Sequence, residues 1–119
     1  MQSSDSLKNT ISKINNFVEE RDWGQFHTVK NLAASVSIEA AELNETIQWE
    51  NPELEEILQN DSLLQDIGNE IADVVIYSLR LCSILNLDVI ALIDRKIESN
   101  KEKYPIDKSK GSSKKYTQF

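Results

Sequence analysis

Very few residues in this chain interrupt a helix: three Gly and two Pro are spread over 119 residues. Strands and tight turns would need those residues, and only 7% of the chain is aromatic. Long stretches instead combine Leu, Ile, Ala, Glu, Lys and Asn. We therefore predict an all-α fold with one main domain, because a chain of this length buries one core more readily than two.

Apolar residues recur at helical intervals in four segments, which predicts a four-helix bundle. The expected helices cover about residues 5–20, residues 28 or 30 to 49, residues 61–86 and residues 89–103, with a short linking helix at residues 52–59. Capping residues give the expected starts: Asn51 followed by Pro52 for the linking helix, Asp61 or Ser62 for the long helix, and Asp88 for the last helix.

Each of the two central helices has an apolar stripe. The stripe of the second helix is expected to contain Leu32, Val36, Ala40, Leu43 and Ile47, and that of the third helix Leu63, Ile67, Ile71, Val74, Ser78 and Leu85. The third helix is also apolar outside its stripe, at Val75, Ile76, Leu79 and Cys82. Such a helix is buried by more than its own chain's helices, or lies in a subunit interface.

Charge and composition exclude several classes of protein. The net charge of −7 argues against binding to a nucleic-acid polymer, which needs a basic surface. The single cysteine, Cys82, allows no disulfide framework and is typical of a reducing cytoplasm. We expect no membrane span and no signal peptide. Residues 106–119 are basic and lack helical periodicity, so we divide the chain into a domain at residues 1–105 and a flexible tail at residues 106–119.

Two matched pairs of acidic residues are the strongest chemical signal. Glu39 and Glu42 lie about 60° apart beside the stripe of the second helix, and Glu70 and Asp73 repeat this spacing on the third. Antiparallel packing of these helices would bring four carboxylates together. A single pair is commonly an ordinary solvated face, but two matched pairs favour a cation site. Because all ligands are oxygen, Mg²⁺ is preferred and Mn²⁺ is a possible substitute.

Aromatic and basic side chains surround these pairs in the sequence. Trp23, Phe26 and His27 precede the second helix, Trp49 ends it, and Tyr77 lies one turn beyond Asp73. They fit either core packing or the stacking of a nucleobase, and a lone histidine is often structural. Lys96, Asn100 and Lys103 share one face of the last helix, which is either solvated or suited to phosphate oxygens.

The chain resembles the all-α nucleoside triphosphate pyrophosphohydrolases, the MazG-like superfamily, and within it the dCTP pyrophosphatase group. The hallmark E-x-x-E followed by E-x-x-D is present as "EAAE" and "EIAD", and "ERDWGQFH", "IQW", "DVVIYSL", "KIESNKEKYP" and "SSKKYT" extend the similarity. The resemblance implies hydrolysis of a deoxynucleoside triphosphate, dCTP or a modified dCTP, to monophosphate and pyrophosphate. It also implies a homo-oligomer, either a dimer or a tetramer built as a dimer of dimers.

The same resemblance implies roles for individual residues. Metal ligands match Glu39, Glu42, Glu70 and Asp73, and the residue that activates water matches Glu42 or Glu45. Base and sugar contacts match Trp23, His27, Trp49 and Tyr77, and phosphate contacts match Lys96, Asn100, Lys103 and Tyr104. Lys115 and Tyr116 in the tail match residues that close over a neighbouring subunit's site.

Two alternatives remain open at this point. The substrate could be another nucleotide, such as dUTP or a phosphoribosyl-nucleotide. A different class is a non-catalytic acidic helical module that binds a basic partner. Stabilisation by Mg²⁺ separates an enzyme with a cation site from such a module.

Overall fold

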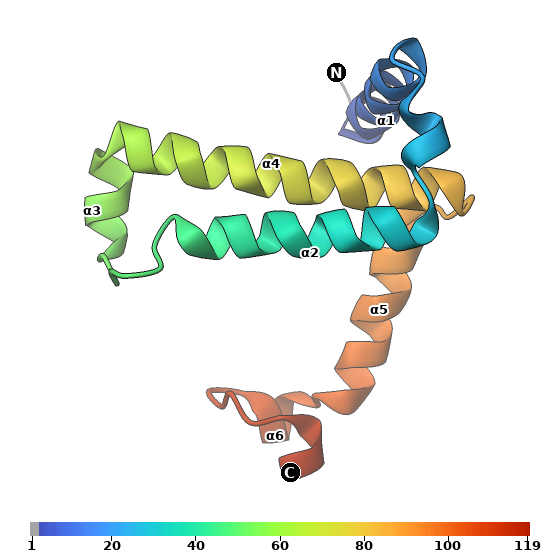
Figure 1. The fold of residues 1–119 in the computed structure, drawn as a ribbon. Coiled ribbons are helices and arrows are strands. Elements are labelled where there is room, and N and C mark those ends of the chain that lie inside the picture. Colours follow the sequence, from blue (N-terminus) through green and yellow to red (C-terminus); the bar gives the residue numbers. More distant parts are fainter. Residues whose placement is uncertain (1–2) are drawn as a thin grey trace. The chain divides into compact units, whose positions relative to one another are not determined.

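The computed structural model describes residues 3–119, with side chains from Ser6 onward, and these residues contain helices but no strand (Figure 1). The α-helices are α1 (Ser3–Glu20), α2 (Val29–Glu45), α3 (Leu54–Gln59), α4 (Asp61–Ile84), α5 (Val89–Lys103) and α6 (Ile106–Ser109). Two 3₁₀ helices, η1 (Trp23–Phe26) and η2 (Tyr116–Gln118), complete the list. The prediction of an all-α fold is confirmed. The chain forms two compact units, and the boundary between them in the sequence lies between Asn86 and Leu87.

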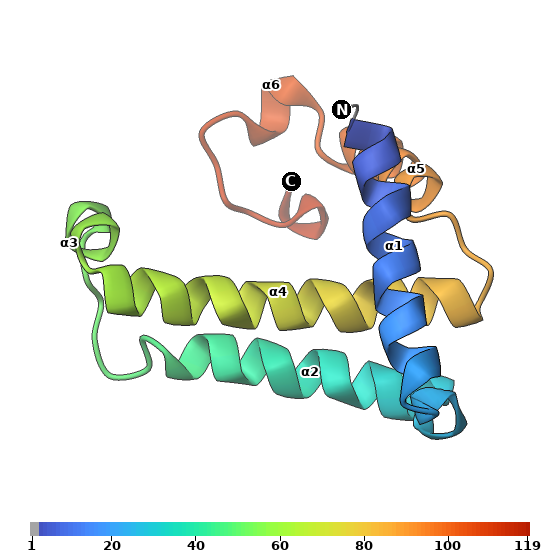
Figure 2. The same ribbon diagram turned by 90° about the horizontal axis from the view of Figure 1, so that it is seen from above.

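The first unit is built on α2 and α4, which lie side by side and antiparallel and are connected through α3 (Figures 1 and 2). Helix α1 crosses the C-terminal half of α4 (Figure 2). Among residues with described side chains, the buried apolar ones are Val18, Leu32 and Leu79, one from each of these three helices. The core of this unit is therefore small.

Along the contact between α2 and α4, residues recur at the four- and three-residue steps of a helical seam. On α2 these residues are Leu32, Val36, Glu39 and Leu43, and on α4 they are Leu63, Ile67, Glu70, Val74, Tyr77 and Leu81, all buried or half-buried. Glu39 and Glu70 thus occupy seam positions that an apolar residue would normally fill. The expected stripes were wrong in part: Ala40, Ile71 and Leu85 are exposed, and so is Ile47, which lies beyond the end of α2. The seam runs through the glutamates instead of around them.

Side-chain caps fix several helix starts. Asp88 Oδ1 accepts hydrogen bonds from the backbone N–H groups of Ile90 and Ala91, as predicted. Helix α4 is capped one residue earlier than expected, because Asn60 Oδ1 accepts from Leu63 N at 3.1 Å. Thr28 Oγ1 likewise accepts from Asn31 N at 3.1 Å at the start of α2.

Two other predicted boundaries were wrong. Helix α2 ends at Glu45 and not at Trp49, because the Thr46 hydroxyl donates to the Leu43 carbonyl at 2.7 Å and the chain continues as turns. The linking helix begins at Leu54 and not at Pro52, because Glu53 is still extended, with φ −67° and ψ 153°. The residues between α2 and α3 are used to reverse the chain direction.

The second unit contains α5, α6 and η2. We expected no helix after residue 105, but Pro105, with φ −63°, precedes the single turn of α6. Tyr116 and Phe119 both lie edge-on to Tyr104, with ring centroids 5.8 Å away, and Lys103 Nζ lies 5.1 Å from the centre of the Tyr116 ring. The last residues therefore pack on the end of α5. The domain boundary after residue 105 and the mobility of the tail stay predictions.

Within residues 3–119, no single helix has both the length and the hydropathy needed to cross a bilayer. Helices α4 and α5 reach that threshold only when they are counted together across the break between them.

The small core predicts a strong dependence on Leu32, which is only 1% exposed. Leu32→Ala should lower the free energy of unfolding by about 2–4 kcal/mol, because it removes buried methyl groups and leaves a cavity. Ile106→Ala, at a residue 78% exposed, should cost less than about 1 kcal/mol and serves as the control. Urea denaturation at one fixed protein concentration measures both values, and equal losses would contradict the assignment of the core.

Candidate functional site

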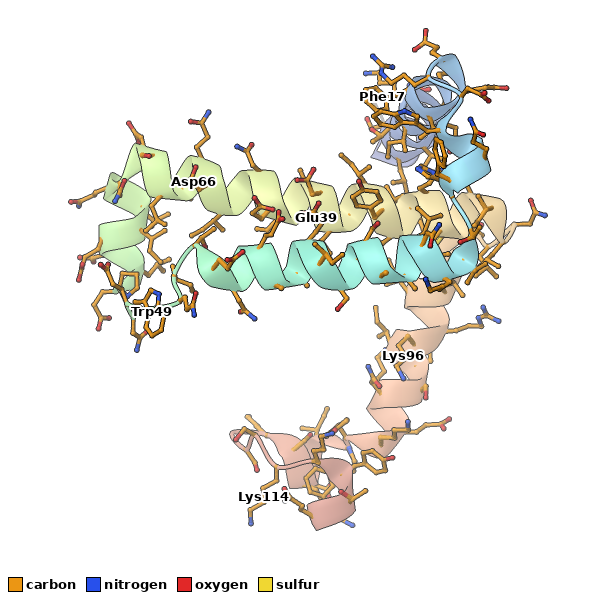
Figure 3. The ribbon with its side chains drawn as sticks, in the orientation of Figure 1. Phe17, Glu39, Trp49, Asp66, Lys96 and Lys114 are labelled. Carbon is orange, nitrogen blue, oxygen red and sulfur yellow. The ribbon has the colours of Figure 1, made fainter. Side chains whose placement is uncertain are left out.

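Three predicted metal ligands meet between the central helices. Glu39 of α2 and Glu70 and Asp73 of α4 each place one carboxylate oxygen within 4.8 Å of the others. Figure 3 shows Glu39 between the two helices. We call these three residues the acidic triad. All three are half-buried, so their charges are only partly hydrated.

The triad has more negative charge than its surroundings can stabilise. A hydrogen bond with Glu42, together with burial and the charges of Glu42, Asp73 and Glu70, raises the pKa of Glu39 to about 7. Burial, followed by a hydrogen bond with Glu42, raises the pKa of Glu70. Among the described residues, no group hydrogen-bonds the buried Oε2 atoms of Glu39 and Glu70. Because Glu42 contributes to both raised pKa values, this fourth predicted ligand belongs to the same cluster.

The chemistry of this cluster fits a divalent cation. Its ligands are carboxylate oxygens, which hard cations prefer. A cation would satisfy the two buried oxygens that lack a partner and would neutralise carboxylates that repel each other. Which metal binds, and through which of the four carboxylates, stays a prediction.

A hollow of about 370 Å³ opens beside the triad at the end of α2. The predicted catalytic residues Glu42 and Glu45 both line it, and Glu45 is exposed. Asp66 and Asn69 of α4 also line it, and sequence reasoning missed them. Their signal was present, because Asp66 lies four residues before Glu70 and so falls on the same face of α4, one turn closer to its start.

A second cavity, of about 440 Å³, lies between α1, η1 and α4; we call it the aromatic pocket. Three of the residues predicted to contact the base, Trp23, His27 and Tyr77, line it together. The Trp23 ring also lies edge-on to Phe17, at a centroid distance of 5.5 Å. Asp73 of the triad lines this pocket too, so the pocket and the triad adjoin each other.

His27 is held by a residue that sequence reasoning missed. Arg80 Nε donates a hydrogen bond to His27 Nδ1 at 3.0 Å, across 53 positions of sequence. Burial, followed by the charge of Arg80, lowers the pKa of His27. No spacing rule connects two residues so far apart, and Arg80 lies inside an otherwise apolar segment.

The remaining predicted substrate residues lie elsewhere in the chain. Trp49 is 88% exposed and lies near α3, at the opposite end of the helix pair from Phe17 (Figure 3). Lys96, Asn100 and Lys103 lie on α5 and are exposed, and Tyr104 follows that helix. They belong to the second unit, and their contacts with phosphate stay predictions. Closure of Lys115 and Tyr116 over a neighbouring site also stays a prediction.

A family model described as the MazG-like family matches residues 34–119. This chain belongs to the MazG-like family. The resemblance inferred from "EAAE" and "EIAD" is confirmed. Among solved structures, this MazG-like chain is similar to a pyrophosphatase from Archaeoglobus fulgidus, with 39% identity and a TM-score of 0.76 over 84% of this chain and 93% of that one.

The MazG-like chain is also similar to curated proteins named dCTP pyrophosphatase 1. Identity is 33% over 106 residues with the protein of Rattus norvegicus and 32% over 108 residues with that of Homo sapiens. These alignments cover 85% and 87% of this chain, but 60% and 61% of the relatives. The chain thus spans about three fifths of the length of the curated relatives it matches.

The raised pKa of Glu39 predicts how stability depends on pH without metal. Between the ordinary value of 4.5 and the folded value of about 7, the folded state keeps a proton that the unfolded state has lost. The contribution of this group to the free energy of unfolding should therefore decrease as pH rises from about 5 to 8. A divalent cation competes with that proton, so Mg²⁺ should raise the melting temperature more at pH 8 than at pH 5.

The variant Glu39→Gln isolates this effect from the other acidic groups. At pH 8 without metal it should melt at a higher temperature than the wild type, because one half-buried negative charge that repels its neighbours is gone. It should also lose most of the stabilisation by Mg²⁺. The control Glu55→Gln, at an exposed residue of α3, should behave like the wild type. Full Mg²⁺ stabilisation of Glu39→Gln would contradict a cation site at the triad.

Proposed function

We propose that this chain hydrolyses deoxynucleoside triphosphates, with dCTP or a modified dCTP as the preferred substrate, to the monophosphate and pyrophosphate. The observation that carries the proposal is the position of Asp73, which belongs to the acidic triad and also lines the aromatic pocket. A nucleotide needs these two environments next to each other, one for its phosphates and one for its base. The names of the curated relatives support the choice of dCTP, and the name of the solved structure supports the release of pyrophosphate.

Glu39, Glu42, Glu70 and Asp73 are the residues that would hold the metal, Mg²⁺ or in its place Mn²⁺. When bound, such a cation supplies charge that neutralises the triphosphate and polarises the phosphorus. The chain's own residues would bind the base and the phosphates and orient the attacking water. Trp23 and Tyr77 offer aromatic surfaces to the base in the aromatic pocket.

Between the two candidates for activating water, we favour Glu45. Glu42 is half-buried beside Glu39 and Glu70 and helps to raise the pKa of both, so we assign it to the cation site. Glu45 lies one turn further along α2, is exposed, and lines the same hollow. Its carboxylate is therefore free to accept a hydrogen bond from the attacking water and orient it. Lys96, Asn100, Lys103 and Tyr104 are proposed to bind phosphate oxygens.

We also propose that the protein works as a homodimer or homotetramer. Leu64, Ile71 and Val75 form an apolar stripe on α4 and are 41%, 48% and 47% exposed. Gly68 lies on the same stripe, and a Cβ there would meet nothing within 4 Å in the chain itself. A second copy would cover this stripe. Trp49 does not line the aromatic pocket of its own chain, and we propose that it contacts the pocket of that second copy. We place the enzyme in the cytoplasm, where its single cysteine stays reduced.

Turnover of a nucleotide panel tests the activity. With Mg²⁺, the protein should release pyrophosphate from dCTP and 5-methyl-dCTP faster than from dUTP or dTTP, and chelation should abolish the reaction. Glu42→Gln and Asp73→Asn should each lower kcat at least about 100-fold with unchanged helicity, because each removes a charge that the cation site needs. Glu55→Gln is the control. Absence of turnover together with absence of Mg²⁺ stabilisation would favour the non-catalytic helical module.

Light scattering tests the assembly. The wild type should have two or four times the mass of one chain. Val75→Asp should reduce this mass, because it places a charge on the apolar stripe. Ile106→Asp, at the exposed α6 residue, should leave the mass unchanged. A wild-type mass equal to one chain would overturn the proposal of an oligomer.

A further inference from the structure

A continuous chain of hydrogen bonds connects α1, α4 and the residue after η1. Asn15 Nδ2 donates to Ser83 Oγ at 3.2 Å, Arg80 Nη1 donates to Asn15 Oδ1 at 2.9 Å, and Arg80 Nε donates to His27 Nδ1 at 3.0 Å. All three bonds are partly buried, and each joins residues more than 50 positions apart. Nothing in the proposed reaction requires this network, so it needs a separate explanation.

The direction of each bond follows from the chemistry of its donors. A guanidinium only donates, so His27 Nδ1 must be the acceptor and carries no proton. A neutral imidazole has one N–H, which must then be on Nε2. Asn15 is fixed in the same way, because its amide nitrogen is used by Ser83 and its oxygen faces Arg80.

The guanidinium is also confined on its remaining side. Its Nη2 lies 3.8 Å from the place where a Cβ on Gly24 would be, so it lies against the backbone of η1. With Asn15 on one side and η1 on the other, Arg80 has little freedom to turn away from His27. The ring of His27 is thus held at the wall of the aromatic pocket, which Arg80 also lines.

We propose that Arg80 is a positioning residue that holds His27 in the Nε2–H form, so that the aromatic pocket selects a flat ligand with a hydrogen-bond acceptor on its edge. This inference rests on the proposed function in taking that ligand to be a nucleobase. A pyrimidine offers a carbonyl oxygen, and cytosine also an unprotonated ring nitrogen, to such a donor. The exocyclic amine of cytosine is a donor and is not read by His27.

Burial and the Arg80 charge support this assignment, because both disfavour a second proton on the ring and lower the pKa of His27. Lys13 and Asp73 are the other charged groups that line the pocket. Neither has a hydrogen bond to His27 within the described residues, whereas Arg80 does. The tautomer is therefore set by a direct contact.

Nitrogen NMR of the untagged 119-residue chain tests the tautomer directly, because the chain contains one histidine. At pH 8 we expect a proton on Nε2, none on Nδ1, and a through-hydrogen-bond coupling between Arg80 Nε and His27 Nδ1. In Arg80→Met the coupling should vanish and the His27 pKa should rise. In the control Arg95→Met, at an exposed arginine of α5, both should stay as in the wild type. A proton on Nδ1, or no coupling in the wild type, overturns the proposal.

Two further measurements test recognition. Titration with dCMP should shift the Nε2–H resonance and leave the Arg80 coupling in place, and an unmoved resonance at saturation overturns the acceptor-reading role. Arg80→Met should raise KM for dCTP about tenfold and leave kcat within about twofold, as expected for loss of an orienting hydrogen bond in binding. A parallel loss of kcat and melting temperature would indicate a purely structural role and overturn the proposal.

Failure of this inference is distinguishable from failure of the proposed function. The NMR coupling is measured without turnover, so a protein that shows it but hydrolyses no nucleotide overturns only the function. A protein that hydrolyses dCTP but lacks the coupling overturns only the role of Arg80.

Discussion

Mutual repulsion of carboxylates inside a helix seam is the constraint on which the rest of this structure depends. Glu39 and Glu70 take positions in the contact between α2 and α4 that would otherwise be apolar, and each leaves one buried oxygen without a hydrogen-bond donor. An apolar pair in their place would hold the two helices together more strongly. The seam therefore gives up packing energy to keep a strong negative potential at one place, as expected of a site that binds a cation.

Outside the seam, α4 also leaves apolar surface uncovered. With Val18, Leu32 and Leu79 as the buried centre of the first unit, packing within one chain stabilises α4 on only part of its surface. The stripe at Leu64, Ile71 and Val75 offers further apolar area that packing against a second copy would bury. The proposed assembly would stabilise the first unit by burying apolar surface, and the proposed cation would stabilise it by neutralising the carboxylates.

Local sequence signals predicted the elements well, and non-local contacts account for what they missed. Helical periodicity located α1, α2, α4 and α5, and Asp88 was recognised as a cap because its partners are two and three residues away. The three-residue spacing shared by Glu39 and Glu42 and by Glu70 and Asp73 predicted the acidic cluster. The stripes were misjudged because glutamates were assumed to border the seam, when in fact they lie in it. The contact between Arg80 and His27 was missed because it depends on how α1 and η1 pack on α4, which no local pattern encodes.

The aromatic pocket draws many of its walls from a different part of the chain than the acidic triad does. Lys13, Ile14, Phe17 and Trp23 belong to α1 and η1, whereas the triad belongs to α2 and α4. The family match begins only at residue 34, beyond those pocket residues. Substitutions at these α1 and η1 residues therefore reshape the cavity without changing a residue of the acidic triad. The shape of the pocket and the charge of the triad are thus set by largely separate residues, and Asp73 is the one residue among those described that belongs to both.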